Sequence, residues 1–98
     1  MSRIELSHAV AMDLERILQH LLDHDSPHIG SRAEEILAAI DVLQGNPHIG
    51  RPVGGGRREL VIGRRDRGYL ALYRFAEDID VVFVLAIRNQ REAGYLAD

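Results

Sequence analysis

The spacing of apolar residues divides the chain into a helical first half and a strand-rich second half. Residues 3–6 alternate polar and apolar side chains, which predicts a short first strand. Ser7 follows as a predicted helix N-cap, and the apolar positions of residues 8–24 then recur every three or four residues, as in an amphipathic helix. The apolar stripe of this helix consists of Val10, Leu14, Ile17, Leu18, Leu21 and Leu22, and its polar side includes Asp13, Glu15, Arg16, Gln19 and Asp23.

A second helix is predicted to begin at Pro27, with Ser26 as its cap, because proline suits the first turn of a helix. It ends at residues 45–47, where glycine, asparagine and proline form a stop signal. Because the break between the two helices is short, we expect a helical hairpin that buries both stripes. The second stripe consists of Ile29, Ala33, Ile36, Leu37, Ile40 and Leu43.

After Pro47 the sequence changes to strand-like runs. Residues 50–56 are too rich in glycine and proline for a regular element, so we predict a connector there. The runs 58–62, 69–76 and 81–87 follow with short turns, which predicts antiparallel neighbours, and the last run is apolar on both faces, like a central strand. The predicted fold class is α+β: a short N-terminal strand and a helical hairpin packed on an antiparallel β-sheet.

Composition narrows the function without identifying it. The 98 residues predict a single domain, 1–98, whose thin core leaves no room for a large cofactor, and we predict none. The absence of cysteine excludes disulfides and thiolate metal sites. The chain has no long apolar run and no secretory signal, so we expect a cytoplasmic protein that does not contact a membrane.

The charges are distributed unevenly. All 12 basic residues are arginine, and residues 49–98 hold nine of them against seven acidic residues, whereas residues 1–48 hold three against eight. Guanidinium groups bind carboxylates and phosphates equally well, so an acidic protein segment and a nucleic acid both fit, beside a solvated surface without function. The predicted partner-binding residues are Arg57, Arg58, Arg65, Arg74 and Arg88.

Other candidate chemistry is weak. His20, His24 and His28 are spaced by four, but Pro27 starts a new helix between them, so we predict no metal site. The glycines at 54–56 lack the lysine of a phosphate-binding loop, and no serine lies in a nucleophile elbow.

Several stretches, taken in order, resemble one known family. They are residues 13–17, 40–43 with Pro47, 50–53, 58–60, 68–74 and 84–95. Together they resemble the RelE/ParE superfamily of toxins from bacterial type II toxin–antitoxin modules, closer to its ParE branch, over essentially the whole chain. The resemblance implies the fold already predicted and a cognate antitoxin, often acidic, as partner. ParE-like members, in modules of the plasmid-stabilisation type, poison DNA gyrase, whereas RelE-like members cut mRNA on the ribosome.

The residues that serve RNA cleavage in RelE-like members are largely missing here. Leu70 stands where the family usually has arginine, Asn89 stands where ribonucleases place arginine, and no lysine is present. The candidates that remain for a ribonuclease are Arg88, Arg91 and Tyr95, and cleavage needs groups that transfer protons near neutral pH. We therefore predict a gyrase inhibitor that acts by binding. The alternatives are a ribosome-dependent endoribonuclease and a degenerate toxin that only binds its antitoxin.

Overall fold

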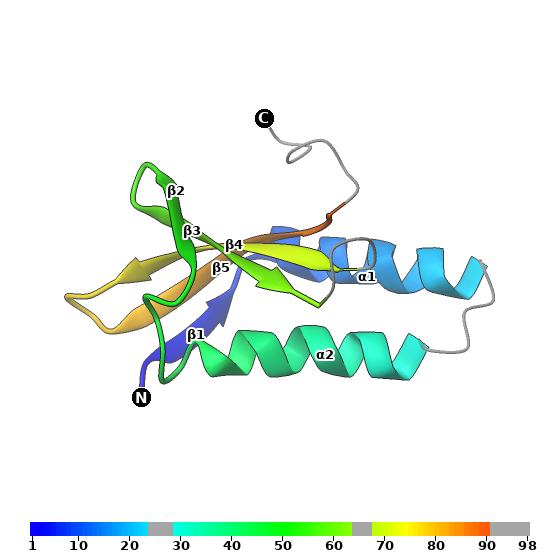
Figure 1. The fold of residues 1–98 in the computed structure, drawn as a ribbon, viewed down its shortest axis with the longest axis horizontal. Helices are drawn as coiled ribbons and strands as arrows, with labels where there is room; N and C mark the ends of the chain where they lie inside the picture. The colour runs from blue at the N-terminus through cyan, green and yellow to red at the C-terminus, as the bar shows by residue number, and fades with distance from the viewer. Residues whose placement is uncertain (24–28, 64–67, 91–98) are drawn as a thin grey trace.

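The computed structural model describes residues 1–23, 29–63 and 68–90 and contains two helices and a five-stranded sheet. Figure 1 shows the helices running side by side along the long axis, with the β-hairpins at the opposite end of the molecule from the last turn of the first helix and the first turn of the second. No helix in these ranges is long and apolar enough to cross a membrane. The elements are β1 (Arg3–Leu6), α1 (His8–Asp23), α2 (Ile29–Val42), β2 (Arg51–Gly54), β3 (Arg57–Ile62), β4 (Tyr69–Ala76) and β5 (Val81–Asn89).

The sheet has the strand order β1-β5-β4-β3-β2 and is mixed. The antiparallel pairing of β3, β4 and β5 is confirmed, and β2 adds an antiparallel neighbour to β3. In contrast, β1 pairs with β5 in parallel, with Arg3 opposite Val81 and Leu6 opposite Val84. Parallel neighbours need a long crossover, which the helices and the meander supply here. β5 lies between β1 and β4, so the prediction that the most apolar run is a central strand is confirmed.

β2 is a strand that the sequence did not predict. Residues 51–54 pair with β3, with a register shift between Pro52 and Gly54. Proline and glycine are tolerated because β2 is the edge strand, where a missing N–H donor need not break the ladder. Gly54, Gly55 and Gly56 then turn the chain into β3 with φ angles of 94°, 63° and 74°, a backbone region that favours glycine.

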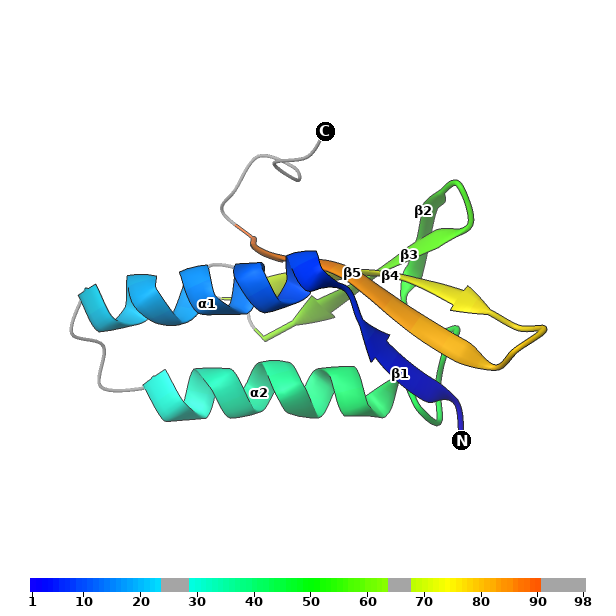
Figure 2. The same cartoon turned by 180° about the vertical axis from the view of Figure 1, so that it is seen from behind.

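Both helices pack on one face of the sheet, as Figure 2 shows from behind. In β4, Tyr69, Ala71 and Tyr73 enter the core beneath the helices, and Leu70 and Arg74 alternate to the opposite side, which we call the open face. The core consists of Val10, Ile17, Leu21, Ile36, Ile40, Leu43, Ile62, Tyr69, Ala71, Tyr73, Val82, Val84 and Ile87.

The apolar stripes of the two helices contain fewer buried residues than predicted. Leu18, Leu22 and Leu37 are 36%, 57% and 50% exposed, although all three were expected in the core. Asp13 was expected on the polar side of α1 and is instead buried. The Ser7 cap is confirmed, since its Oγ accepts a hydrogen bond from the Val10 N–H at 3.3 Å. The predicted start of the second helix, with Ser26 and Pro27, lies outside the described residues.

Candidate partner-binding surface

Two arginines of the predicted partner-binding set lie together on the open face. Arg57 of β3 and Arg74 of β4 are directly opposite each other in the antiparallel ladder, and both side chains are exposed. The side chains of directly opposed residues are close enough to interact, and like charges in this position repel. Residues 57 and 74 therefore concentrate two positive charges at one point of the sheet.

The arginines elsewhere in the described ranges are engaged within the chain. Arg3 pairs with Glu5, Arg16 with Asp13, Arg51 with Glu59, Arg58 with backbone carbonyls and Arg88 with Asp13, and Arg32 is also engaged. Glu59 is the nearest carboxylate to Arg57 along the open face of β3, and its Oε1 accepts from Arg51 at 3.1 and 2.5 Å. Within the described part of the chain, no acidic side chain neutralises Arg57 or Arg74.

Arg58 holds the connection between α2 and β2. Its Nη1 donates to the carbonyls of His48 at 3.1 Å and Gly50 at 2.7 Å. The hydroxyl of the fully buried Tyr73 donates to the Pro47 carbonyl at 2.9 Å and accepts from the Gly50 N–H at 2.8 Å. A Cβ on Gly50 would lie 2.7 Å from the Tyr73 ring, so only glycine fits there. Arg58 thus stabilises a loop within the chain. It is half-buried, so it is less accessible to a partner than the sequence implied.

Arg88 is buried and does not lie on the exposed arginine surface. Its Nη1 donates to Asp13 Oδ1 of α1, and the two side chains are 8% and 9% exposed. Asp13 Oδ2 also accepts from the Ile87 N–H at 2.9 Å, beyond the point where β1 stops pairing with β5 at Val84. Both oxygens of Asp13 are therefore hydrogen-bonded, which offsets part of the cost of burying the ion pair, and the pair joins α1 to the end of β5.

Of the three ribonuclease candidates, Arg88 lies within the described residues. Arg88 lies opposite Leu70 across the β4–β5 ladder and is held by Asp13. Arg91 and Tyr95 lie outside the described residues, as does Arg65 of the partner-binding set. Within the described ranges, no group of three His, Asp or Glu side chains could hold a metal ion. His24 and His28 of the histidine series also lie outside these ranges.

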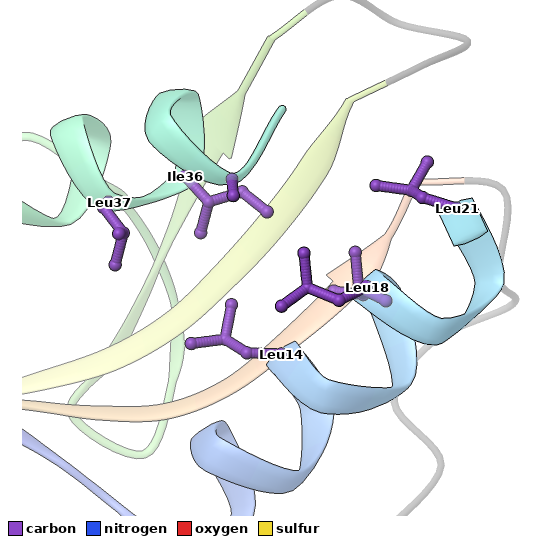
Figure 3. Close-up of a pocket in the computed structure, with 7 residues that line it drawn as sticks. Leu14, Leu18, Leu21, Ile36 and Leu37 are labelled. Carbon is purple, nitrogen blue, oxygen red and sulfur yellow. The ribbon is translucent and has the colours of Figure 1, made fainter. Parts of the chain in front are cut away.

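An apolar groove between the two helices is a second candidate surface. It encloses about 80 Å³ and is lined by side chains from both helices. Figure 3 shows Leu14, Leu18 and Leu21 of α1 and Ile36 and Leu37 of α2 directed into the same space. Leu18 and Leu37 are partly exposed, so the groove opens to solvent and can accept apolar side chains.

Sequence reasoning missed Asp13 and Tyr73 as organising residues. Asp13 lies three residues after Val10 and four before Ile17, so its position is on the buried side of α1 although its type is polar. The spacing could have identified it. Tyr73 was not singled out from the sequence, because its hydroxyl partners Pro47 and Gly50 belong to a loop whose path the sequence did not reveal.

A family model described as "ParE toxin of type II toxin-antitoxin system, parDE" matches residues 4–94. A search of curated protein sequences gives no significant match.

Several solved structures share the fold. The structure titled "Chromosomal ParDE TA system from P. aeruginosa" superimposes with a TM-score of 0.75 at 24% identity, covering 91% of this chain and 96% of that chain. The intact E. coli RelBE toxin–antitoxin complex superimposes with a TM-score of 0.62 at 13% identity, covering 94% of this chain and 100% of that chain. The M. tuberculosis RelBE2 complex gives 0.58 at 18% identity and covers 93% of each chain. At these identities the likeness shows a common fold.

Proposed function

Because the chain belongs to the family of ParE toxins of type II toxin–antitoxin systems, we propose that it arrests growth by binding DNA gyrase, without cleaving RNA. An antitoxin, encoded beside it, binds the toxin in the cytoplasm and keeps it inactive. The solved relatives include toxin–antitoxin complexes of the same fold, which supports a protein partner of this kind.

The burial of Arg88 is the observation that favours a toxin that acts by binding over one that cleaves RNA. Its guanidinium is buried and neutralised by Asp13, so it is turned away from any substrate. The neighbouring residues 68–70 and 87–90 include a tyrosine, an asparagine and a glutamine, but no histidine or carboxylate. RNA cleavage by general acid–base catalysis depends on groups whose pKa lies near the working pH, and this end of the sheet supplies none among those residues.

A supercoiling assay with purified toxin and gyrase tests the proposal. We expect the toxin to inhibit supercoiling and the equimolar antitoxin to restore it. Growth arrest on expression without inhibition of gyrase would contradict the proposal.

Primer extension on translated mRNA distinguishes a ribonuclease from the proposed toxin that acts by binding. Arg91→Ala and Tyr95→Phe should leave growth arrest intact if the toxin acts by binding. New mRNA ends that disappear in these variants would favour the ribonuclease. Normal growth on expression without the antitoxin would favour a degenerate toxin.

A further inference from the structure

The two arginines that pair with no acidic side chain of the described ranges form part of a row of side chains that runs across three strands. Arg57 of β3 lies opposite Arg74 of β4, and Arg74 in turn lies opposite Phe83 of β5. Phe83 is half-buried, and a hollow beside it at the end of the β4–β5 hairpin is also lined by Arg74 and by Ile79, which is 58% exposed. The open face therefore presents two cations and an apolar floor side by side.

We propose that this row is the docking site for an extended segment of the antitoxin in which an Asp or Glu is followed two residues later by a large apolar residue. The assignment rests on the proposed function for the identity of the partner. One carboxylate placed between the two guanidinium groups accepts hydrogen bonds from both, which relieves their repulsion. The apolar side chain then covers Phe83 and Ile79.

The spacing follows from strand geometry. Neighbouring strands are about 4.8 Å apart, so a point midway between Arg57 and Arg74 lies about 7 Å from the strand that carries Phe83. An extended peptide that crosses the strands advances about 3.3 Å per residue, and residues two apart point to the same side. An acidic residue and an apolar residue with one residue between them match this distance.

The surroundings favour a peptide over a nucleic acid. Glu77 and Asp78 line the same hollow, and both are exposed, with Glu77 Oε1 3.1 Å from His48 Nε2. A nucleic acid carries a phosphate at every nucleotide, and these carboxylates would repel the phosphates that follow the first. A protein segment can place a single carboxylate at the arginines and an uncharged side chain beside the acids.

Titration of the toxin with its antitoxin by calorimetry tests the site. We expect Arg57→Gln and Arg74→Gln each to weaken binding about tenfold, as for loss of a hydrogen bond between charged groups. The double variant should weaken binding less than the product of the two single effects, because both arginines hold one carboxylate. Phe83→Ala should weaken it about fivefold. Arg3→Gln removes the same charge from the opposite edge strand, where Arg3 pairs with Glu5, and should change the dissociation constant less than twofold.

An Asp→Asn and Glu→Gln scan of the antitoxin completes the test. One substitution should reproduce the tenfold loss and have little further effect on toxin that carries Arg57→Gln and Arg74→Gln together. Tight binding that Arg57→Gln, Arg74→Gln and Phe83→Ala each alter by no more than twofold would overturn the site while leaving the proposed function standing. Selective loss of duplex DNA binding in the arginine variants would also overturn it. Failure of the wild-type toxin to bind the antitoxin would instead refute the proposed function.

Discussion

Arginines lie in two parts of the sheet, and they differ in burial and in pairing: one is buried and neutralised, whereas the other two are exposed. At the end of β5, Arg88 is buried and its charge is neutralised by Asp13 from α1. On the open face, Arg57 and Arg74 are exposed, lie opposite each other, and have no acidic partner within the described ranges. The contrast teaches that an arginine count cannot distinguish charges that maintain the fold from charges that remain available to a partner.

The largest expected effect comes from breaking the buried pair. Asp13→Ala should lower the free energy of unfolding by about 3–5 kcal/mol, because it leaves the Arg88 charge and the Ile87 N–H without their acceptor in a buried site. Urea denaturation followed by circular dichroism measures this loss. Asp41→Ala, at an exposed position of α2, is the matched control. A loss below about 1 kcal/mol would show that Arg88 does not depend on this pairing.

A second variant divides the two functions of Asp13. Asp13→Asn keeps an oxygen for the Ile87 N–H but removes the charge that balances Arg88. The loss in free energy of unfolding should be smaller for Asp13→Asn than for Asp13→Ala. The difference between the two losses measures the contribution of the hydrogen bond to the Ile87 N–H. Equal losses in both variants would assign the whole effect to charge.

An intermediate effect is expected at the loop that Arg58 and Tyr73 hold. Tyr73→Phe leaves the Gly50 N–H and the Pro47 carbonyl without a hydroxyl partner, and should lower the free energy of unfolding by about 1–3 kcal/mol. Tyr69→Phe, on the same face of β4, is the control. A change below 0.5 kcal/mol, about the scatter of surface substitutions, would contradict this role for the hydroxyl.

Alkaline pH tests the same hydroxyl. Burial raises the pKa of the Tyr73 phenol above its ordinary value of 10.0, although the Gly50 N–H and the Arg58 charge act in the opposite direction. The fold therefore favours the protonated phenol. Its contribution to stability is complete below pH 10.0 and is lost as the pH rises through the folded-state pKa. Chemical denaturation between pH 8 and pH 11 should show the advantage of the wild type over Tyr73→Phe declining at the upper end.

The smallest effect has the opposite sign. Arg57→Gln or Arg74→Gln removes one of two like charges placed opposite each other, and should raise the free energy of unfolding by about 0.2–1 kcal/mol. The gain should shrink as salt is added, because both side chains are exposed and the repulsion is screened. Thermal denaturation at low and high salt measures it. Arg3→Gln, which breaks an exposed pair with Glu5, should give no gain.

Most of the fold was predictable from local pattern. The helical hairpin, the three strands of the meander and the faces of β4 follow from periods of 3.6 and 2 that each segment shows by itself. The parallel pairing of β1 and the edge strand β2 were not predictable in this way. The pairing of β1 joins opposite ends of the chain, and β2 contains the Pro52 and Gly54 that disfavour a strand in isolation.

The site was predictable in part, for a related reason. Arg57 and Arg74 were both singled out, but their meeting depends on the strand register between β3 and β4, which composition does not specify. Arg88 was taken for a surface charge because its partner, Asp13, is more than 70 residues away in the sequence. Burial of a charge is decided by a partner that a local reading of the sequence does not reach.

The pairing of β1 with β5 has a consequence for the synthesis of the toxin. The first strand finds its neighbour only in the last described strand, and Ser2 bonds to Asp80, 78 positions later, at 2.6 Å. During translation β1 therefore has no neighbour until β5, more than 70 residues later, has emerged. A nascent or truncated chain that lacks β5 has neither the strand that joins β1 to β4 nor the partner of Asp13. A cell that makes this protein therefore completes the sheet only after residues 81–89 have been synthesised.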